Sequence, residues 1–459
     1  GAAAAAAGGA MGAGGDGRPA APDLPAAQLR QLEPHKLPRV LPERWVKVGA
    51  WEYDVTGFKH PGGNVINYML ANTGADATDA FREFHSRSKK AQVVLRSLPR
   101  RQPCLAEPYP REEQAMLDAF AQFRRGLEAE GFFAPSALHL AWRVAEVGLI
   151  FALGTLLLAR GHLLLGVLAL GLFGGRCGWL QHEGGHNSLT GDVWWDKRIQ
   201  AAAIGLGLGT SGSMWNGMHN KHHSTPQKIK YDMDLDTTPL VAFFDTAVES
   251  NRVRGYSRKW LRFQAWTFLP VTSGALVMLF WLLFLHPRHA LRTGNWEEGL
   301  WMLSSHVLRT AAIKIACPGL GLAACYGLLW ASFWISGMYL FGHFSLSHTH
   351  TGTVPADAHI SWVRYAVDHT VDIDPHRGWV NWVMGYLNCQ VVHHLFPNMP
   401  QFHQPEVSRR FAAFAREWDL DYKVISYPEA WRRTFSNLND VGKVYIAKQK
   451  RAGRAKKER

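Results

Sequence analysis

The chain has 459 residues, of which 47% are hydrophobic and 12% aromatic, and its formal net charge is +13. This length leaves room for two or three domains, and the five cysteines form no Cys-x-x-Cys pair, which argues against a disulfide framework and for reduced thiols. The basic excess favours an anionic membrane surface or an acidic ligand over nucleic acid, because long apolar stretches occupy the middle of the chain.

Residues 1–32 are rich in Ala, Gly and Pro, and this composition predicts a disordered segment. A charged stretch followed by an apolar run is not found there, so a cleaved signal peptide is not expected.

Residues 33–100 form a polar unit with haem-ligand candidates. Alternation in WVKV and WEYDV predicts short strands, and the Pro-Gly-Gly turn after them exposes His60. His85 follows downstream beside aromatic residues. Two such histidines can hold one haem iron from both sides, which gives an electron carrier that leaves oxygen no free position. The motif YDVTGFKHPGG with the later FHS resembles a cytochrome b5 domain, which implies haem b with His60 and His85 as axial ligands.

Residues 101–140 are expected to be a linker with an amphipathic helix from Glu112 to Glu130. Its apolar side would carry Met116, Leu117, Phe120, Phe123 and Leu127.

Four apolar stretches predict membrane-spanning helices, because about 20 residues cross the ~30 Å hydrocarbon core. They are residues 142–159, 163–180, 266–285 and about 318–340. We expect two helical hairpins, and therefore an α-helical membrane protein with a small α+β haem domain at its N-terminal end. The span-bearing domain would run over residues 141–445.

Two hairpins return the chain to one face, so the haem domain, the loops between the pairs and the C-terminus are expected to share it. The many Lys and Arg residues within 181–265 indicate that this face is cytosolic. Residues 296–314 are expected to form an interfacial helix.

Three histidine clusters lie far apart in the sequence. Spacings of three and four place side chains on one helix face, and imidazole suits iron, copper, zinc and nickel. Seven imidazoles exceed the needs of one tetrahedral ion, so the clusters predict two metal ions. The clusters are His182 and His186; His219, His222 and His223; and Gln390, His393 and His394.

The boxes HEGGH, HNKHH and QVVHH, after a cytochrome b5-like unit, resemble those of front-end fatty acyl desaturases over about residues 33–445. Gln390 is the feature that separates this group from desaturases with three complete histidine boxes. It can supply a carbonyl oxygen to metal or support another ligand. Longer stretches, among them CGWLQHEGGHNSLTG and MHNKHHSTPQK, resemble microalgal Δ6 acyl-CoA desaturases.

That resemblance implies two non-haem irons, oxygen, and electrons from NADH-cytochrome b5 reductase. It also implies linoleoyl- and α-linolenoyl-CoA as substrates, a new bond between C6 and C7, and the endoplasmic reticulum membrane as location. The alternatives are another regioselectivity (Δ5, Δ8 or Δ4), a sphingoid-base desaturase or hydroxylase, and a membrane-anchored haem electron carrier without catalysis of its own.

The resemblance further implies a histidine ligand in the span before the third box. His343 occupies that place, and His348 and His350 are the alternatives. The remaining histidines, among them His139 and His286, lack a partner at ligand spacing and are expected at the surface or the membrane interface.

Some polar residues are left with two interpretations. The acidic residues Asp232, Asp234, Asp236, Asp372 and Asp374 either orient ligating imidazoles or are solvated. The cationic candidates for CoA phosphate contacts are Lys221, Lys228, Lys230 and Arg254. The basic tail, residues 446–459, carries Lys456 and Lys457 at the positions of a dilysine retrieval signal, or is simply solvated.

Overall fold

The computed structural model describes residues 43–62, 66, 76–103, 109–229, 231–232, 234, 240–249, 260–355, 358 and 360–457. The segment predicted to be disordered lies outside these ranges, as do Lys230, Asp236 and Arg254.

The N-terminal part of the described chain is a small sheet with helices, as the strand-like alternation predicts. Strands β1 (Trp45–Val48), β2 (Trp51–Asp54) and β3 (Arg100–Arg101) pair antiparallel in that order. The β1–β2 turn contains Gly49 with a φ of +62°, a conformation that glycine adopts without strain. Helices α3 (Thr78–His85) and α4 (Lys89–Ser97) follow β2 in sequence.

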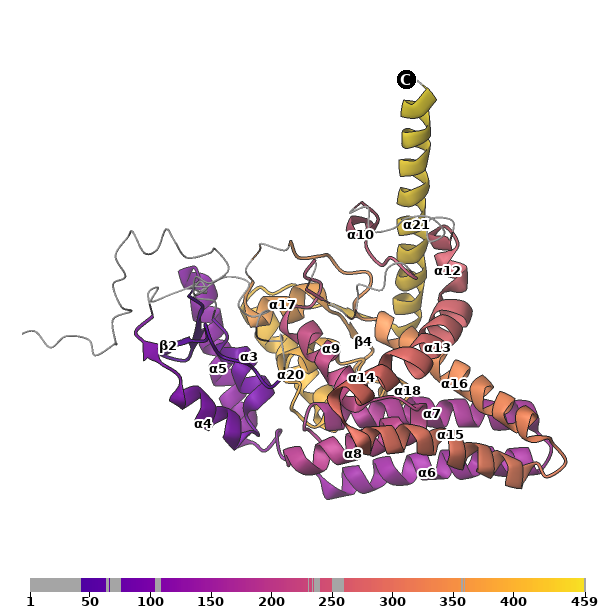
Figure 1. Cartoon of the computed structure of the whole chain (residues 1–459). Coiled ribbons are helices and arrows are strands. Elements are labelled where there is room, and N and C mark those ends of the chain that lie inside the picture. The colour runs from indigo at the N-terminus through magenta and orange to yellow at the C-terminus, as the bar shows by residue number, and fades with distance from the viewer. Residues whose placement is uncertain are drawn as a thin grey trace, which may run out of the picture. The chain divides into compact units, whose positions relative to one another are not determined.

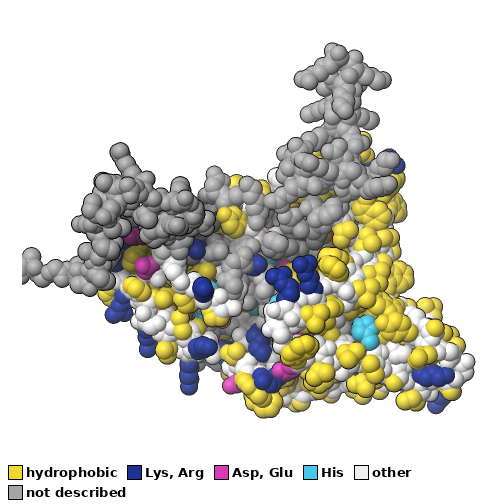
Figure 2. All heavy atoms as spheres, viewed as in Figure 1, with side chains coloured by type: hydrophobic (Ala, Val, Ile, Leu, Met, Phe, Trp, Pro, Cys, Tyr) yellow, Lys and Arg dark blue, Asp and Glu magenta, His cyan; other side chains and the backbone are white. Residues whose placement is uncertain are grey.

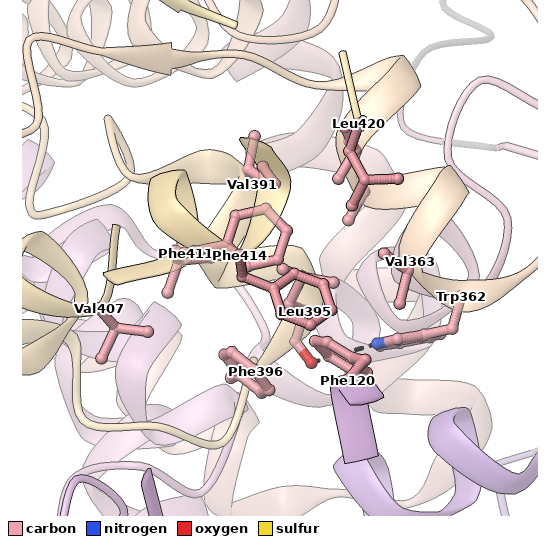
Figure 3. Packing of buried hydrophobic residues seen from close by; sticks show 14 of the residues in the cluster. Phe120, Trp362, Val363, Val391, Leu395, Phe396, Val407, Phe411, Phe414 and Leu420 are labelled. Carbon is pink, nitrogen blue, oxygen red and sulfur yellow. Dashed lines mark hydrogen bonds between the residues drawn. The ribbon is translucent and has the colours of Figure 1, made fainter. Parts of the chain in front are cut away.

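Helix α5 (Arg111–Ala129) matches the predicted amphipathic helix. It packs its apolar side into a core shared with α17 (Trp362–His369), α19 (Gln390–Leu395) and α20 (Gln404–Glu417) (Figure 3). The ring of Phe120 stacks on Phe396 with 5.4 Å between centroids. The indole N–H of Trp362 donates to the Leu395 carbonyl at 3.1 Å. This core holds the helix that carries the third histidine box.

In the part of the chain that the structure describes, four helical segments are long and apolar enough to cross a membrane. They are α6 (Ala137–Ala159), α7 (Leu163–Gly185), the segment Gln264–Thr293, and α16 (Leu322–Ser345). The third segment is built in turn from α12 (Gln264–Thr267), η2 (Phe268–Val277), α13 (Met278–Phe280), η3 (Trp281–Leu285) and α14 (His286–Thr293). Both η2 and η3 are π-helical. The predicted four spans are thus present as helices.

The first pair of spans, α6 and α7, is joined by a tight turn and lies side by side (Figure 1). The second pair of spans is connected through a further helix, at the place of the predicted interfacial helix. Helix α16 packs against η2, but α15 (Trp296–Ala316) lies between the two spans in sequence and packs on α8 (Val193–Leu208) and α16. Ile315 of α15 remains 80% exposed, so this helix also presents apolar surface outward. Figure 2 shows hydrophobic side chains gathered over the face formed by α13 and α16.

Close approach between α7 and α16 depends on small residues. A Cβ added at Gly174 would collide with the Ser336 hydroxyl. Ser336 in turn donates to the Gly171 carbonyl at 2.8 Å. Small residues at a helix–helix contact are typical of membrane proteins, where they let two backbones meet. This contact fixes the helix that ends in the first histidine box against α16.

The remaining described elements include the helix of the second histidine box and a second, two-stranded sheet. Strand β4 (Asp372–Ile373) pairs parallel with β5 (Val424–Ile425). The other elements are α9 (Gly212–Ser224), α10 (Asp245–Glu249), α18 (Gly378–Val383), η4 (Gln401–His403) and α21 (Tyr427–Lys457). Four of the five cysteines, Cys177, Cys317, Cys325 and Cys389, are free and buried, as predicted for reduced thiols.

Candidate metal centre

Three helices bring the histidine boxes together. The first box lies at the C-terminal end of α7, the second on the last two turns of α9, and the third on the short helix α19. Helix α9 begins at Ser211, whose hydroxyl accepts the Met214 N–H at 3.1 Å, a capping bond that fixes the start of the helix. All seven box histidines are buried. The sequence-predicted convergence of the boxes is therefore observed.

The first group of histidines, which we call group one, collects five imidazoles whose ligand atoms lie within 4.8 Å of one another. The Nε2 atom of His219 is 3.1 Å from that of His182 and 3.0 Å from that of His223. The Nε2 atom of His393 is 3.1 Å from that of His223. Group one consists of His182, His186, His219, His223 and His393.

The second group, group two, contains His222, His348 and His394, again with ligand atoms within 4.8 Å of one another. The Nε2 atoms of His222 and His348 are 3.3 Å apart. The side-chain amide of Gln390 lies 2.8 Å from His348 Nε2, and turning the amide would present its oxygen there instead. Groups one and two are adjacent, because the rings of His223 and His394 stack with 4.2 Å between centroids.

These residues fit two metal ions. Burial lowers the pKa of His186, His223, His348 and His394 well below the usual value, so the imidazoles are neutral and their lone pairs are free for a cation. Among the described residues, the buried Nε2 atoms of His186 and His394 have no hydrogen-bond partner. Unpaired buried nitrogens are costly unless a ligand satisfies them. Two ions, one in each group, would satisfy them.

A cavity of about 640 Å³ adjoins the groups. At one end lie His219, His222, His348 and Gln390, and the rest of the wall is predominantly apolar. That wall includes Trp215, Phe268, Leu276, Val277, Phe280, Trp281, Phe341 and Phe344. Such a space can hold an apolar chain with one part of it against the metal centre.

A sequence model of the fatty acid desaturase family matches residues 158–425. The chain belongs to the fatty acid desaturase family. It is 44% identical over 423 residues to the acyl-lipid (8-3)-desaturase of Rebecca salina, covering 91% of this chain and 95% of that one. It is 41% identical over 399 residues to the acyl-lipid (8-3)-desaturase of Thraustochytrium sp, covering 85% and 90%. The acyl-lipid (9-3)-desaturase of Physcomitrium patens is 26% identical over 426 residues, with 86% and 75% covered.

The expected front-end desaturase is supported by these relatives, and with it an oxidoreductase acting on fatty acyl chains with oxygen. The finer expectation of Δ6 activity on acyl-CoA is not supported, because the two more similar relatives carry the (8-3) name.

The structure places His348, not His343, in the desaturase's second histidine group. Both ring nitrogens of His343 face other partners, with Nδ1 2.6 Å from the Tyr339 carbonyl and Nε2 2.9 Å from the Tyr427 hydroxyl. The other alternative, His350, has its Nε2 2.8 Å from the Leu346 carbonyl. The histidine outside the boxes was expected within the span before the third box. In the structure it is His348, which lies in the turn after α16.

Two carboxylates orient imidazoles, one in each group. Asp232 is 2.9 Å from Nδ1 of His222, and Asp234 is 2.9 Å from Nδ1 of His219. Burial alone would lower the pKa of His222, but the charge and hydrogen bond of Asp232, together with the charge of Asp234, raise the pKa above its usual value. A carboxylate on Nδ1 fixes the tautomer and leaves Nε2 for metal. Asp232 and Asp234 were expected either to orient imidazoles or to be solvated, and in the structure both orient imidazoles.

Asp372 does not touch an imidazole but holds the helix that carries two of them. Its carboxylate accepts the Val391 N–H at 2.8 Å, the Ser408 hydroxyl at 2.5 Å and the Tyr422 hydroxyl at 2.5 Å. The bond to Val391 anchors the first turn of α19. The other candidate, Asp374, accepts the Tyr427 N–H at 2.9 Å and so has a structural role.

Two histidines that were expected at the surface or the membrane interface instead support the histidine boxes, and of these His286 is buried and His139 is half-buried. His139 Nε2 lies 2.8 Å from a carboxylate oxygen of Glu183 in the first box, whose other oxygen is 3.1 Å from Arg143 Nε. His286 accepts the Ser211 N–H through Nδ1 at 2.9 Å, at the start of α9. Ligand spacing in the sequence cannot reveal either contact, because each partner lies more than 40 residues away.

The proposed phosphate contact Lys228 is also placed differently. Its side chain is buried and donates to the Ala358 carbonyl at 2.9 Å. Lys228 therefore stabilises the chain at Ala358, and its ammonium group is too buried to bind a CoA phosphate.

The two haem-ligand candidates face one another. The ring centroids of His60 and His85 are 5.9 Å apart, and the planes are inclined by 51°. Burial and the nearby His60 lower the pKa of His85 to about 4, which keeps its ring neutral and available to a metal. Two imidazoles that face one another at this separation could both bind one haem iron.

Proposed function

We propose that this protein is a front-end desaturase with (8-3) regioselectivity that acts on a polyunsaturated acyl chain carried by a lipid. The observation that carries this proposal is the pair of adjacent histidine groups at one end of an apolar cavity. The (8-3) and acyl-lipid designations of relatives at 44% and 41% identity support the regioselectivity and the carrier. We interpret (8-3) as an existing double bond at C8 and a new one three carbons nearer the carboxyl group, at C5.

The reaction removes two neighbouring hydrogens from the chain and leaves a double bond. Its balance requires oxygen, two electrons and two protons besides the two substrate hydrogens, and it yields two waters. Two iron ions bound by the histidine groups would supply the oxygen chemistry that cleaves an unactivated C–H bond.

The residues around the centre position its ligands and exclude water. Asp232 and Asp234 hold the Nδ1 sides of His222 and His219, so Nε2 of each ring faces the metal position. His222, His348 and Gln390 line the cavity end, so this end presents the reacting carbons to group two. The apolar wall keeps bulk water from that contact.

We further propose that His60 and His85 hold haem b, which would supply electrons one at a time. NADH-cytochrome b5 reductase is the proposed reductant of this haem. The endoplasmic reticulum membrane, with the haem region and the boxes on the cytosolic side, is the proposed location.

The test is expression in yeast fed separately with three acids. Linoleic acid reports Δ6 activity, an acid with double bonds at C11 and C14 reports Δ8 activity, and one with double bonds at C8, C11 and C14 reports Δ5 activity. Mass spectrometry of the products locates the new bond, and separate analysis of phospholipid and acyl-CoA pools identifies the carrier.

We expect a new bond at C5, appearing first in phospholipid, and no product from His222→Ala. A C6 bond formed on linoleate, or a hydroxylated product, contradicts the proposal.

A further inference from the structure

The helix that ends in His85 also touches the metal centre. Phe84 is the residue before His85, and its ring centroid lies 6.5 Å from that of His223, with the planes at 87°. A second edge-to-face contact joins Phe84 to Trp362 at 5.9 Å. Successive residues of a helix point about 100° apart. Helix α3 can therefore direct His85 towards His60 and Phe84 towards the metal groups.

His223, the imidazole that Phe84 contacts, lies where groups one and two meet. It belongs to group one, its Nε2 lies 3.1 Å from that of His393, and its ring stacks on His394 of group two. An electron that reaches His223 is thus beside both groups.

Helix α3 is docked on the desaturase core by buried contacts. Glu83 forms an ion pair with Arg124 of α5 at 2.5 Å, and the two side chains are 0% and 5% exposed. Ala80 is 3% exposed and belongs to the core cluster around the third box. A buried ion pair with one partner removed costs about 3–5 kcal/mol, so this contact holds α3 in one position.

The chain just beyond α3 is held as well. Arg87 donates to the Phe133 carbonyl at 2.6 Å and to the Asn398 carbonyl at 3.3 Å. The Asn398 amide donates to the Ser86 hydroxyl at 2.5 Å. Asn398 follows the third histidine box, so the contacts of Ser86 and Arg87 tie the chain just after His85 to the segment that carries His393 and His394.

We propose that Phe84 is the bridge by which electrons pass from the haem held by His60 and His85 to the metal centre of the same chain. This inference rests on the proposed function. Each transfer oxidises a ferrous haem to ferric and gives one electron to the metal centre, and the flavoprotein reductase re-reduces the haem. Two transfers occur for each double bond formed. Electron tunnelling falls exponentially with distance, so an aromatic ring in contact with a ligand is a favoured route.

In this arrangement the haem region stays docked on the desaturase core. It does not move to and from the metal centre on a flexible linker. A swinging carrier needs no buried ion pair and no aromatic contact with a metal ligand. The contacts of Glu83, Phe84 and Arg87 are those of a stationary electron entry point.

The experiment measures haem reoxidation in the purified full chain. Haem is reduced with a stoichiometric amount of dithionite, then mixed with oxygen and substrate lipid, and its absorbance is followed by stopped flow. Phe84→Leu keeps an apolar side chain but removes the ring, and Phe84→Met is a second variant of similar volume. The matched control is Phe81→Leu, since Phe81 packs on His85 at 5.0 Å from the same helix.

We expect Phe84→Leu and Phe84→Met to slow haem reoxidation about tenfold, with Phe81→Leu close to the parent protein. Haem content, non-haem iron content, haem potential and unfolding temperature should not change. Excess dithionite with methyl viologen, which reduces the metal centre directly, should restore product formation in the Phe84 variants.

Reoxidation of both Phe84 variants at the parent rate overturns the bridge, as does a slowing in Phe81→Leu of equal size. A parent protein without a haem spectrum, or without product when methyl viologen supplies the electrons, overturns the proposed function instead.

Discussion

The two histidine groups lie side by side, yet they are assembled in different ways. Group one takes all five imidazoles from the boxes on α7, α9 and α19. In group two, only His222 and His394 come from the boxes. The third imidazole is that of His348, and the Gln390 amide lies beside it. Helical spacing therefore specifies group one, whereas group two depends on a turn that tertiary packing brings in.

The groups also differ in what they face. His222 and His348 of group two line the apolar cavity, together with Gln390. Of group one, only His219 does so. Phe84 contacts His223, which is not among the residues that line the cavity. In the proposed enzyme, substrate would approach group two, and electrons would enter through group one.

Removing an imidazole from either group should have the largest effect. His182→Ala removes a ligand of group one and His222→Ala one of group two. Each should lower product formation by more than about a hundredfold, because even residues that only support a ligand cost 10–100-fold. Product analysis by mass spectrometry measures the loss, and an unchanged haem spectrum is the control. Activity retained in either variant argues against the metal assignment.

Variants of His348 and His343 test which of the two histidines completes group two from outside the three boxes. His348→Ala should remove about one of the two non-haem irons per chain, because His348 belongs only to group two, and it should lower activity by about a hundredfold. His343→Gln should stay within about tenfold, since its partners are Tyr339 and Tyr427. Metal analysis of the two purified variants decides between them. The reverse order would restore His343 as the ligand.

The supporting carboxylates should give intermediate effects. Asp232→Asn acts on His222 of group two, and Asp234→Asn acts on His219 of group one. Each should weaken metal retention about 10–100-fold, which a chelator competition measures. If neither variant loses metal faster than the parent protein, the hydrogen bonds do not support the ligands.

The smallest effect is expected at Asp372, which holds α19 and so acts on both groups. Burial raises the pKa of Asp372 to about 6. The hydrogen bonds from Ser408, Tyr422 and the Val391 N–H lower this pKa, but burial has the larger effect. The folded protein thus binds this proton more tightly than the unfolded chain, whose Asp pKa is about 3.9. The resulting stabilisation is complete below about pH 4 and is lost as pH rises through about 6.

Asp372→Asn should therefore flatten the change of unfolding temperature between about pH 4 and 6. Thermal unfolding across this range measures it, with Asp374→Asn as the control. A parent protein whose unfolding temperature does not fall with rising pH in this window contradicts the raised pKa.

Much of this architecture is local and could be predicted from the sequence. The lengths of the apolar stretches predicted the four spans, and the alternation of residues 45–55 predicted two strands. Helical spacing predicted that the seven histidines of the boxes would meet. What the sequence missed depends on distant partners. His348 meets His222, His139 meets Glu183 and His286 meets the start of α9 only because the chain folds back. Helix α15 lies where an interfacial helix was expected, but its packing against α8 joins residues far apart in the chain, which composition does not reveal.

The proposed chemistry requires two metal ions in two differently built histidine groups, and the metal content of the purified full chain tests this claim most directly. Inductively coupled plasma analysis gives total iron, and the pyridine haemochrome spectrum gives the haem share. We predict two non-haem irons per chain besides one haem, falling to one non-haem iron in His348→Ala. A parent protein in which all the iron is haem iron would contradict the claim.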